Sequence, residues 1–247
     1  MRARVLSAPA VAPRRIAGFP LGRLIRDVSS VLIISGLLLV LDAAVTLVWQ
    51  EPVTAVIGLI EESSIDNQYL SFTVAPLTPV QNHVLGALPK PEDRIAYLAR
   101  REQRLLATGD AIGHITIPNI GASYTVVQGT DTASLEKGPG HYPATAVPGL
   151  GQTVAIAGHR TTYLAPFRHI DALKPGDKIV LTMPYGLFTY SVQFHRIVPP
   201  TALWVTRDVG YERLVLSACN PLYSAAQRII VFAKLQSVKP LGPARQA

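Results

Sequence analysis

LVLSACNPLYSAAQRIIVFA, residues 214–233, is the stretch that constrains the fold most strongly. Two runs rich in aliphatic and β-branched residues are joined by NPLYSAAQ, a pattern that favours two strands and a connecting turn. We therefore predict an antiparallel hairpin. Its register would place Cys219 opposite Arg228 at the open end of the hairpin, about 5 Å apart.

Cys219 is the only cysteine in the chain, and it allows two interpretations. Free cysteine is among the most buried residue types, so Cys219 can be a small core side chain. It can also be a thiol kept for chemistry, which needs a nearby positive charge or base to become a thiolate. Arg228 could stabilise an oxyanion that forms after attack, or it could be an ion-paired or solvent-facing arginine at a strand end.

Short runs rich in Val, Ile, Thr and aromatic residues extend this β pattern over residues 108–237. Gly, Pro and Asp separate the runs, as in KPGD and IPNIG. Only PFRHIDAL (166–173) is typical of a short helix. We predict a mostly β domain closed into a barrel, which leaves no exposed edge strand. The predicted strands are 112–118, 123–129, 152–158, 177–183, 187–198, 212–218 and 228–235.

Among the six histidines, His159 has the best position for a catalytic role beside Cys219. It follows Gly158 just past a predicted strand, where a strand end presents its side chain to a groove. The other histidines lie in the predicted linker, strands, a Gly/Pro-rich loop or the short helix, where structural or solvent-facing roles fit: His83, His114, His141, His169 and His195. No Cys/His cluster has the spacing of a metal site.

The net charge of +7 belongs mostly to the N-terminal tail. The first 30 residues hold six arginines and one aspartate, which leaves 17 of the 23 Lys and Arg and 15 of the 16 Asp and Glu for the rest. That remainder carries no Lys/Arg stripe, which argues against a nucleic-acid partner.

The segment Val28–Trp49 is apolar and long enough to cross a bilayer core, which takes about 20 residues. Its arginine-rich flank is typical of the cytoplasmic side. We predict a cytoplasmic tail (1–27), one transmembrane helix in the lipid bilayer (28–49), and an extracellular remainder. A cleaved signal peptide is the alternative, but the apolar run is long for one. Asp42 is costly within such a span and lies toward its outer end.

Residues 50–107 are predicted to form an extracellular stalk, since APLTPVQ and GALPKP are proline-rich and lack periodicity. Within this segment, PEDRIAYLARREQRLLATGD (91–110) predicts a helix. Pro91 suits its first turn, acidic residues follow it, and Gly109 would end it. The apolar face would comprise Ile95, Leu98, Leu105 and Leu106. Residues 238–247 are predicted to be a C-terminal tail.

Together these features resemble the sortase family, the cysteine transpeptidases of the Gram-positive cell surface. The resemblance covers residues 108–235 and rests on IGHITIPNIGASYTVVQGTD, AGHRTTYLAPFRHID and LSACNPLYSAAQRIIVFA in this order. The motifs GHRTTYLAPF and CNPLYSAAQR are most similar to those of class E sortases of actinobacteria. The resemblance implies a closed barrel of about eight strands with short helices, behind one membrane helix.

The resemblance also assigns roles to residues. It implies that Cys219 is the nucleophile, His159 the acid and base, and Arg228 the group that stabilises the oxyanion. It places Ala218 and Asn220 against the substrate. The sequence departs from the family in VLSA, where Val215 and Ala218 stand in place of two threonines. No cofactor is implied.

The implied substrate is an exported protein with a C-terminal LAxTG- or LPxTG-type sorting signal, cleaved between Thr and Gly through a thioester. The implied acceptor is an amine of a peptidoglycan precursor or of a pilin. Three alternatives remain. An L,D-transpeptidase would want its histidine close to its cysteine in sequence, unlike His159 and Cys219. A hydrolytic sortase and a membrane-tethered binding module with a structural cysteine stay open.

Overall fold

The computed structural model describes residues 21–48, 52–71 and 76–245. Most of the predicted basic tail and Trp49, the last residue of the predicted span, lie outside these residues. By chain contacts the protein divides into two units, Met1–Ala44 and Val45–Ala247.

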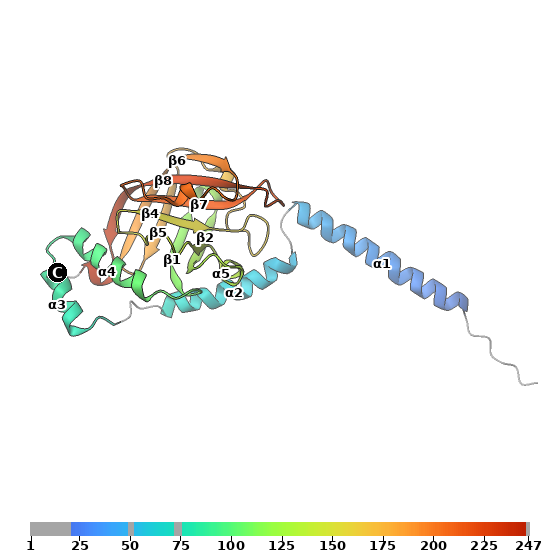
Figure 1. Ribbon diagram of the computed structural model, residues 1–247. Helices are drawn as coiled ribbons and strands as arrows, with labels where there is room; N and C mark the ends of the chain where they lie inside the picture. Colours follow the sequence, from blue (N-terminus) through green and yellow to red (C-terminus); the bar gives the residue numbers. More distant parts are fainter. Residues whose placement is uncertain (1–20, 49–51, 72–75, 246–247) are drawn as a thin grey trace, which may run out of the picture. The chain divides into compact units, whose positions relative to one another are not determined.

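A closed barrel dominates the second unit, as predicted (Figure 1). Neighbouring strands follow the order β1-β2-β3-β4-β7-β8-β6-β5. The pairs β2/β3 and β4/β7 are parallel, and the other pairs are antiparallel. The strands are β1 (Ala111–Ile117), β2 (Ala122–Gln128), β3 (Gly140–His141), β4 (Thr153–Ala157), β5 (Lys178–Met183), β6 (Gly186–Val198), β7 (Arg213–Asn220) and β8 (Gln227–Pro240).

The barrel differs from its sequence prediction in three places. The two-residue strand β3 was not predicted, because so short a pairing leaves no alternating pattern. Strand β8 continues to Pro240, and the turn η4 (Gly242–Arg245) follows with Ala244 fully buried, in the segment predicted to be a tail. The helix predicted at 166–173 is only a 3-10 turn, η2 (Ile170–Ala172). An α-helix here would need the Ala172 N–H to donate to the Arg168 carbonyl. That carbonyl accepts from the Arg160 side chain, and the Ala172 N–H donates to the His169 carbonyl.

Strand β7 shows how the barrel wall separates two apolar layers. Successive side chains of a strand point to opposite faces. Leu214, Leu216 and Ala218 belong to the large interior core, whereas Val215 packs outside the wall. The outer layer lies beneath the β6–β7 connection, which includes η3 (Leu203–Thr206), and contains Ala155, Val198, Ala202, Val205, Ile230 and Phe232. Cys219 follows Val215 by an even number of residues and therefore projects from the outer face.

The segment predicted to be a stalk is folded, which corrects the sequence interpretation. It contains α2 (Pro52–Ser71), α3 (Pro79–Ala87) and α4 (Pro91–Leu105). Helix α4 was predicted, but its Ile95, Leu98 and Ala99 are buried in the barrel core, so it is an integral part of the domain. Leu105, expected on the apolar face, is 57% exposed because α4 ends there.

Helix α2 packs along β1, β2 and the short α5 (Thr132–Lys137) (Figure 1). Ile65 of α2 is buried with Ala111 and Val127, which belong to β1 and β2. Near the other end of α2, a Cβ on Gly58 would lie 3.0 Å from Leu164 Cγ. Thus α2 reaches the loop that follows His159.

In the first unit the structure describes residues 21–44, which belong to α1 (Leu21–Val48). Residues Ile25–Val45 have a mean hydropathy of 2.3 and are not buried by the rest of the chain. This helix is long and apolar enough for a membrane anchor, by length and composition.

Candidate active site

The hairpin formed by β7 and β8 places Cys219 directly opposite Arg228, as the sequence predicted. Val198 of β6 pairs with Arg228 from the other side, so the arginine lies in a continuous wall of three strands. Cys219 is a free thiol and is half-buried. Its side chain is therefore not sealed in either apolar layer.

His159 reaches the same end of the barrel from β4. The parallel pairing of β4 with β7 sets Ala157 opposite Ser217, and Gly158 N–H donates to Ser217 carbonyl at 3.0 Å. His159 and Cys219 each follow that pair by the same number of residues. Gly158 is required here, because a Cβ would lie 2.5 Å from Phe167 Cδ2.

A surface groove of about 340 Å³ joins the thiol to the imidazole. Its lining comes from the loop after β4 and from the β7–β8 turn: His159, Arg160, Thr161, Thr162, Cys219, Tyr223, Ser224 and Ala225. A thiol that faces an open groove beside an imidazole fits nucleophilic chemistry better than a structural role in the core.

Comparison with known proteins agrees with this geometry. A family model described as the sortase domain matches residues 115–236. The solved structure of sortase E from Streptomyces avermitilis is 36% identical, has a TM-score of 0.50, and is matched over 54% of this chain and 93% of that one. The chain belongs to the sortase family. Sortases are cysteine transpeptidases.

Two further relatives are similar over the barrel of this sortase. Sortase E1 from Streptomyces coelicolor, solved with a tripeptide in its active site, is 26% identical with a TM-score of 0.52, over 55% of this chain and 93% of that one. Sortase D from Bacillus subtilis (strain 168) is 36% identical over 132 residues, which are 51% of this chain and 65% of that protein. The chain thus spans slightly less than two thirds of this curated relative.

His159 is held by aromatic and acidic neighbours in this sortase. Its ring lies 5.3 Å from the Tyr163 ring, and Tyr163 Oη donates to Glu136 Oε1 at 2.9 Å. Burial lowers the pKa of His159 below its ordinary value, and the negative charge of Glu136 partly opposes that shift. The carboxylate of Glu136 therefore favours the protonated, imidazolium form of His159.

The loop after His159 carries backbone strain. Tyr163, Leu164 and Ala165 have φ angles of 47°, 63° and 45°, in the left-handed region that costs a non-glycine residue roughly 1–2 kcal/mol. Such conformations persist where the surroundings determine them, and they gather at functional sites. Phe167 N–H returns to the His159 carbonyl at 2.9 Å and closes the loop.

Arg228 is half-buried, and its Nη1 donates to the carbonyls of Ala225 and Gln227 at 3.0 and 2.9 Å. These bonds orient the guanidinium within the β7–β8 turn. A guanidinium carries five N–H donors, of which Nη1 supplies two. Its other N–H groups are the donors that could meet a substrate oxygen, although Arg228 is not among the residues that line the groove.

Ala218 and Asn220, the two residues expected to contact the substrate, lie in different environments. Ala218 is 3% exposed and points into the barrel core, on the opposite face from Cys219, so it does not face the groove. Asn220 is half-buried, and its amide is occupied within the protein. Its Oδ1 accepts from Arg160 Nη1 at 3.2 Å, and its Nδ2 donates to Gln227 Oε1 at 3.2 Å.

Two other histidines take the structural roles that fit their positions. His141 is buried, with Nδ1 2.8 Å from Gln128 Oε1 and Nε2 2.9 Å from the Ala146 carbonyl. His114 lies on β1 and contacts Ser123 Oγ at 2.9 Å. Among the residues that the structure describes, no group of three or more His, Cys, Asp and Glu side chains could hold a metal ion.

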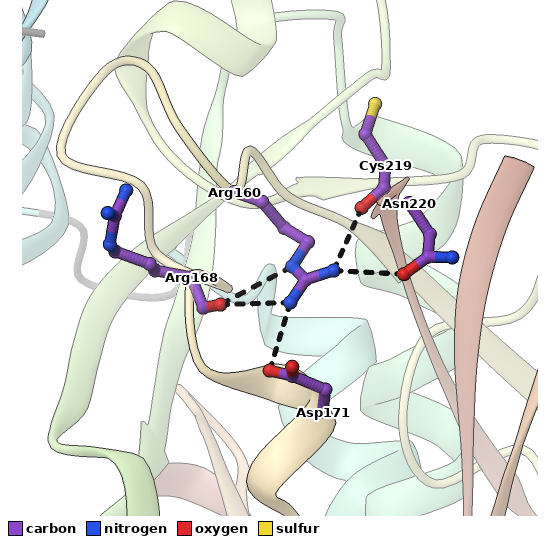
Figure 2. A network of polar contacts seen from close by, with 5 residues as sticks. All are labelled: Arg160, Arg168, Asp171, Cys219 and Asn220. Atoms are coloured by element: carbon purple, nitrogen blue, oxygen red, sulfur yellow. Dashed lines mark hydrogen bonds and ion pairs between the residues drawn. The ribbon is translucent and has the colours of Figure 1, made fainter. Parts of the chain in front are cut away.

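Sequence reasoning missed Arg160 and Glu136. Arg160 is buried directly behind the Cys219 backbone (Figure 2), and Glu136 contacts the His159 loop through Tyr163. The only sequence signal for Arg160 was its position next to His159, inside GHRTTYLAPF.

Proposed function

We propose that this protein is a membrane-anchored sortase that cleaves an LAxTG- or LPxTG-type sorting signal between Thr and Gly and transfers the released acyl group to an amine. The observation that carries the proposal is the arrangement at one end of the barrel. Cys219 is paired with Arg228 and shares an open groove with His159.

In the first half-reaction, the Cys219 thiolate attacks the Thr carbonyl carbon and forms the carbon–sulfur bond. Arg228 donates hydrogen bonds to the oxyanion of the tetrahedral intermediate. His159, as imidazolium, gives its proton to the glycine amine as the carbon–nitrogen bond breaks.

In the second half-reaction, an amine of a peptidoglycan precursor or pilin attacks the thioester. His159 now accepts the proton of the incoming amine, and the thiolate leaves. Water in place of the amine would give hydrolysis. Thiol, imidazole and guanidinium supply the nucleophile, the proton transfers and the charge stabilisation, so the proposed chemistry requires no cofactor.

We assign the anchor role to α1 and place the barrel on the extracellular side. The arginine-rich sequence before α1 supports this orientation, because cytoplasmic flanks carry an excess of Lys and Arg. A sorting reaction on exported chains needs the groove on that side. Labelling of introduced cysteines with an impermeant thiol reagent, in a Cys219→Ala background, tests the orientation.

The first prediction concerns the acyl-enzyme. The full chain in detergent, incubated with LAxTG and LPxTG peptides, should gain the mass of the peptide cleaved after Thr, located on Cys219 by mass spectrometry. Cys219→Ala should lose all turnover, while its thermal unfolding stays close to wild type because the lost volume is small. Peptide cleavage by Cys219→Ala at the wild-type rate would refute the proposal. Added amine separates transfer from hydrolysis by the product formed.

The second prediction concerns the guanidinium. Arg228→Lys keeps the positive charge but loses the forked donors, so we expect kcat/KM to fall by about 10² to 10³. Circular dichroism should stay unchanged, since Arg228 is half-buried and its Nη1 bonds are confined to the turn. Wild-type kcat/KM in Arg228→Lys would remove the oxyanion role.

A further inference from the structure

Arg160 is buried, with 3% of its side chain exposed, between the loop that carries His159 and the end of β7. Toward β7, its Nη1 donates to the Cys219 carbonyl at 3.4 Å and to Asn220 Oδ1 at 3.2 Å. Toward the loop, Nε and Nη2 both donate to the Arg168 carbonyl at 3.3 Å, and Nη2 lies 2.9 Å from Asp171 Oδ1. One guanidinium thus bridges the two segments that bear the thiol and the imidazole.

The direction of these contacts separates Arg160 from the reacting atoms. Figure 2 shows the Cys219 carbonyl facing the guanidinium, while Sγ points away from it. Arg160 therefore acts on the backbone of the nucleophile and not on its sulfur. Burial of a cation is unfavourable unless its donors are satisfied, and here all three nitrogens of the guanidinium have acceptors.

The same side chain closes the strained loop. Residues Tyr163, Leu164 and Ala165, with left-handed φ, lie between Arg160 and Arg168, whose carbonyl accepts two of the hydrogen bonds. Strain of this kind favours rearrangement unless other contacts hold the ends of the segment. The bridge fixes both ends, so it holds the position of His159 relative to β7.

We propose that Arg160 is a positioning residue: its guanidinium ties the His159 loop to the Cys219 strand end and so keeps the imidazole beside the thiol. The proposal rests on the proposed function of Cys219 and His159 and adds a residue to it. A lysine has the charge but cannot reach the Cys219, Asn220 and Arg168 acceptors at once, because it has a single nitrogen.

The test measures alkylation of Cys219 by iodoacetamide between pH 5.5 and 9, which needs no peptide substrate. Because the thiolate is the reactive form and a neighbouring imidazolium stabilises it, Arg160→Lys should react about tenfold more slowly than wild type at pH 6.5, like His159→Ala. If Arg160 acts through His159, the double variant should be no slower than His159→Ala alone.

Arg213→Lys is the matched control. Arg213 is also buried, lies at the opposite end of β7, and donates from Nη2 to the carbonyls of Val205 and Arg207 at 3.0 and 2.9 Å. It should keep the wild-type alkylation profile. The proposal is overturned if Arg160→Lys keeps the wild-type profile, if Arg213→Lys slows alkylation equally, or if the double variant is slower than His159→Ala.

Two further measurements make the outcome unambiguous. Should Arg160→Lys fail to fold by circular dichroism, Asp171→Ala takes its place: alkylation about two- to threefold slower at pH 6.5 supports the proposal, since one of the bridge partners is lost, and an unchanged rate overturns it. Wild-type enzyme is incubated in parallel with LAxTG and LPxTG peptides. Absence of an acyl-enzyme there refutes the proposed function, while the alkylation profiles still decide the role of Arg160.

Discussion

At the scale of single residues, the protonation of His159 controls the proposed proton transfer to the leaving amine. Burial lowers the pKa of His159, and Glu136 opposes that shift, so Glu136→Gln should lower the pKa further. Imidazolium is lost as pH rises through that pKa. The descending limb of kcat/KM against pH should therefore move to lower pH in Glu136→Gln.

The control for this third prediction is Glu92→Gln, which neutralises an exposed carboxylate in the first turn of α4 and should leave the limb in place. A limb that stays fixed in Glu136→Gln, or moves to higher pH, would contradict the assignment of the acid to His159.

The residues that the sequence predicted best are those whose neighbours are set by local rules. Two adjacent strand runs define the pairing of Cys219 with Arg228, and a strand end defines the place of His159. Arg160 could not be predicted, since its acceptors belong to segments brought together only by the β4–β7 pairing. The sequence alone did not say which face of β7 lines the groove, so it could not show that Ala218 faces the core.

At the scale of elements, Glu212 connects the turn before β4 to the start of β7 by hydrogen bonds. Its Oε2 accepts from the N–H groups of Gly149 and Gly151, both at 3.0 Å, and its Oε1 accepts from Tyr190 Oη at 2.7 Å. Burial raises its pKa above the ordinary value, while these hydrogen bonds lower it in part. The carboxylate is therefore retained inside the domain by its three donors.

The fourth prediction is that Glu212→Ala lowers the free energy of unfolding by roughly 2–4 kcal/mol, because it leaves buried donors without an acceptor. Equilibrium urea unfolding measures this difference. Glu212→Gln keeps one acceptor oxygen and should lose less. Equal losses in the two variants would contradict this prediction, because Gln keeps the side-chain volume and one acceptor oxygen whereas Ala keeps neither.

Helices α3 and α4 show which features of a helix can be predicted from sequence and which cannot. Thr78 and Gln81 form a capping box at the start of α3, a pattern that is visible in the sequence. The face of α4 was also visible, but amphipathic periodicity does not name the partner surface. Only the structure shows that this surface is the barrel core.

At the scale of the whole molecule, α2 is part of the folded barrel domain, and one carboxyl makes its packing sensitive to pH. Burial, assisted by the nearby Asp66, raises the pKa of Glu62 from 4.5 to about 7. The packed helix thus binds a proton that the unfolded segment releases between about pH 4.5 and 7. Packing of α2 weakens as pH rises through that window, and the full cost of the charge is present above it.

The fifth prediction follows from Glu62. Amide hydrogen exchange in residues 56–66, corrected for the intrinsic pH dependence of exchange, should show less protection at pH 8 than at pH 5. Glu62→Gln should remove the difference, because the amide stays neutral throughout. Equal protection at pH 5 and pH 8 in the wild type would contradict this prediction.

The closed barrel was predictable from its strand runs, whereas α2 was not, since its sequence lies among proline-rich segments and lacks a strong apolar stripe.

The parallel pairing of β4 with β7 also has a kinetic consequence. The β7–β8 hairpin joins neighbouring segments and can form early, whereas contact between Thr153 and Arg213 must close a long loop, and non-local pairings of this kind slow folding. We therefore expect Cys219 and Arg228 to meet before His159 joins them. We also expect a newly completed chain to carry an unreactive thiol until β4 pairs with β7 and brings His159 beside Cys219.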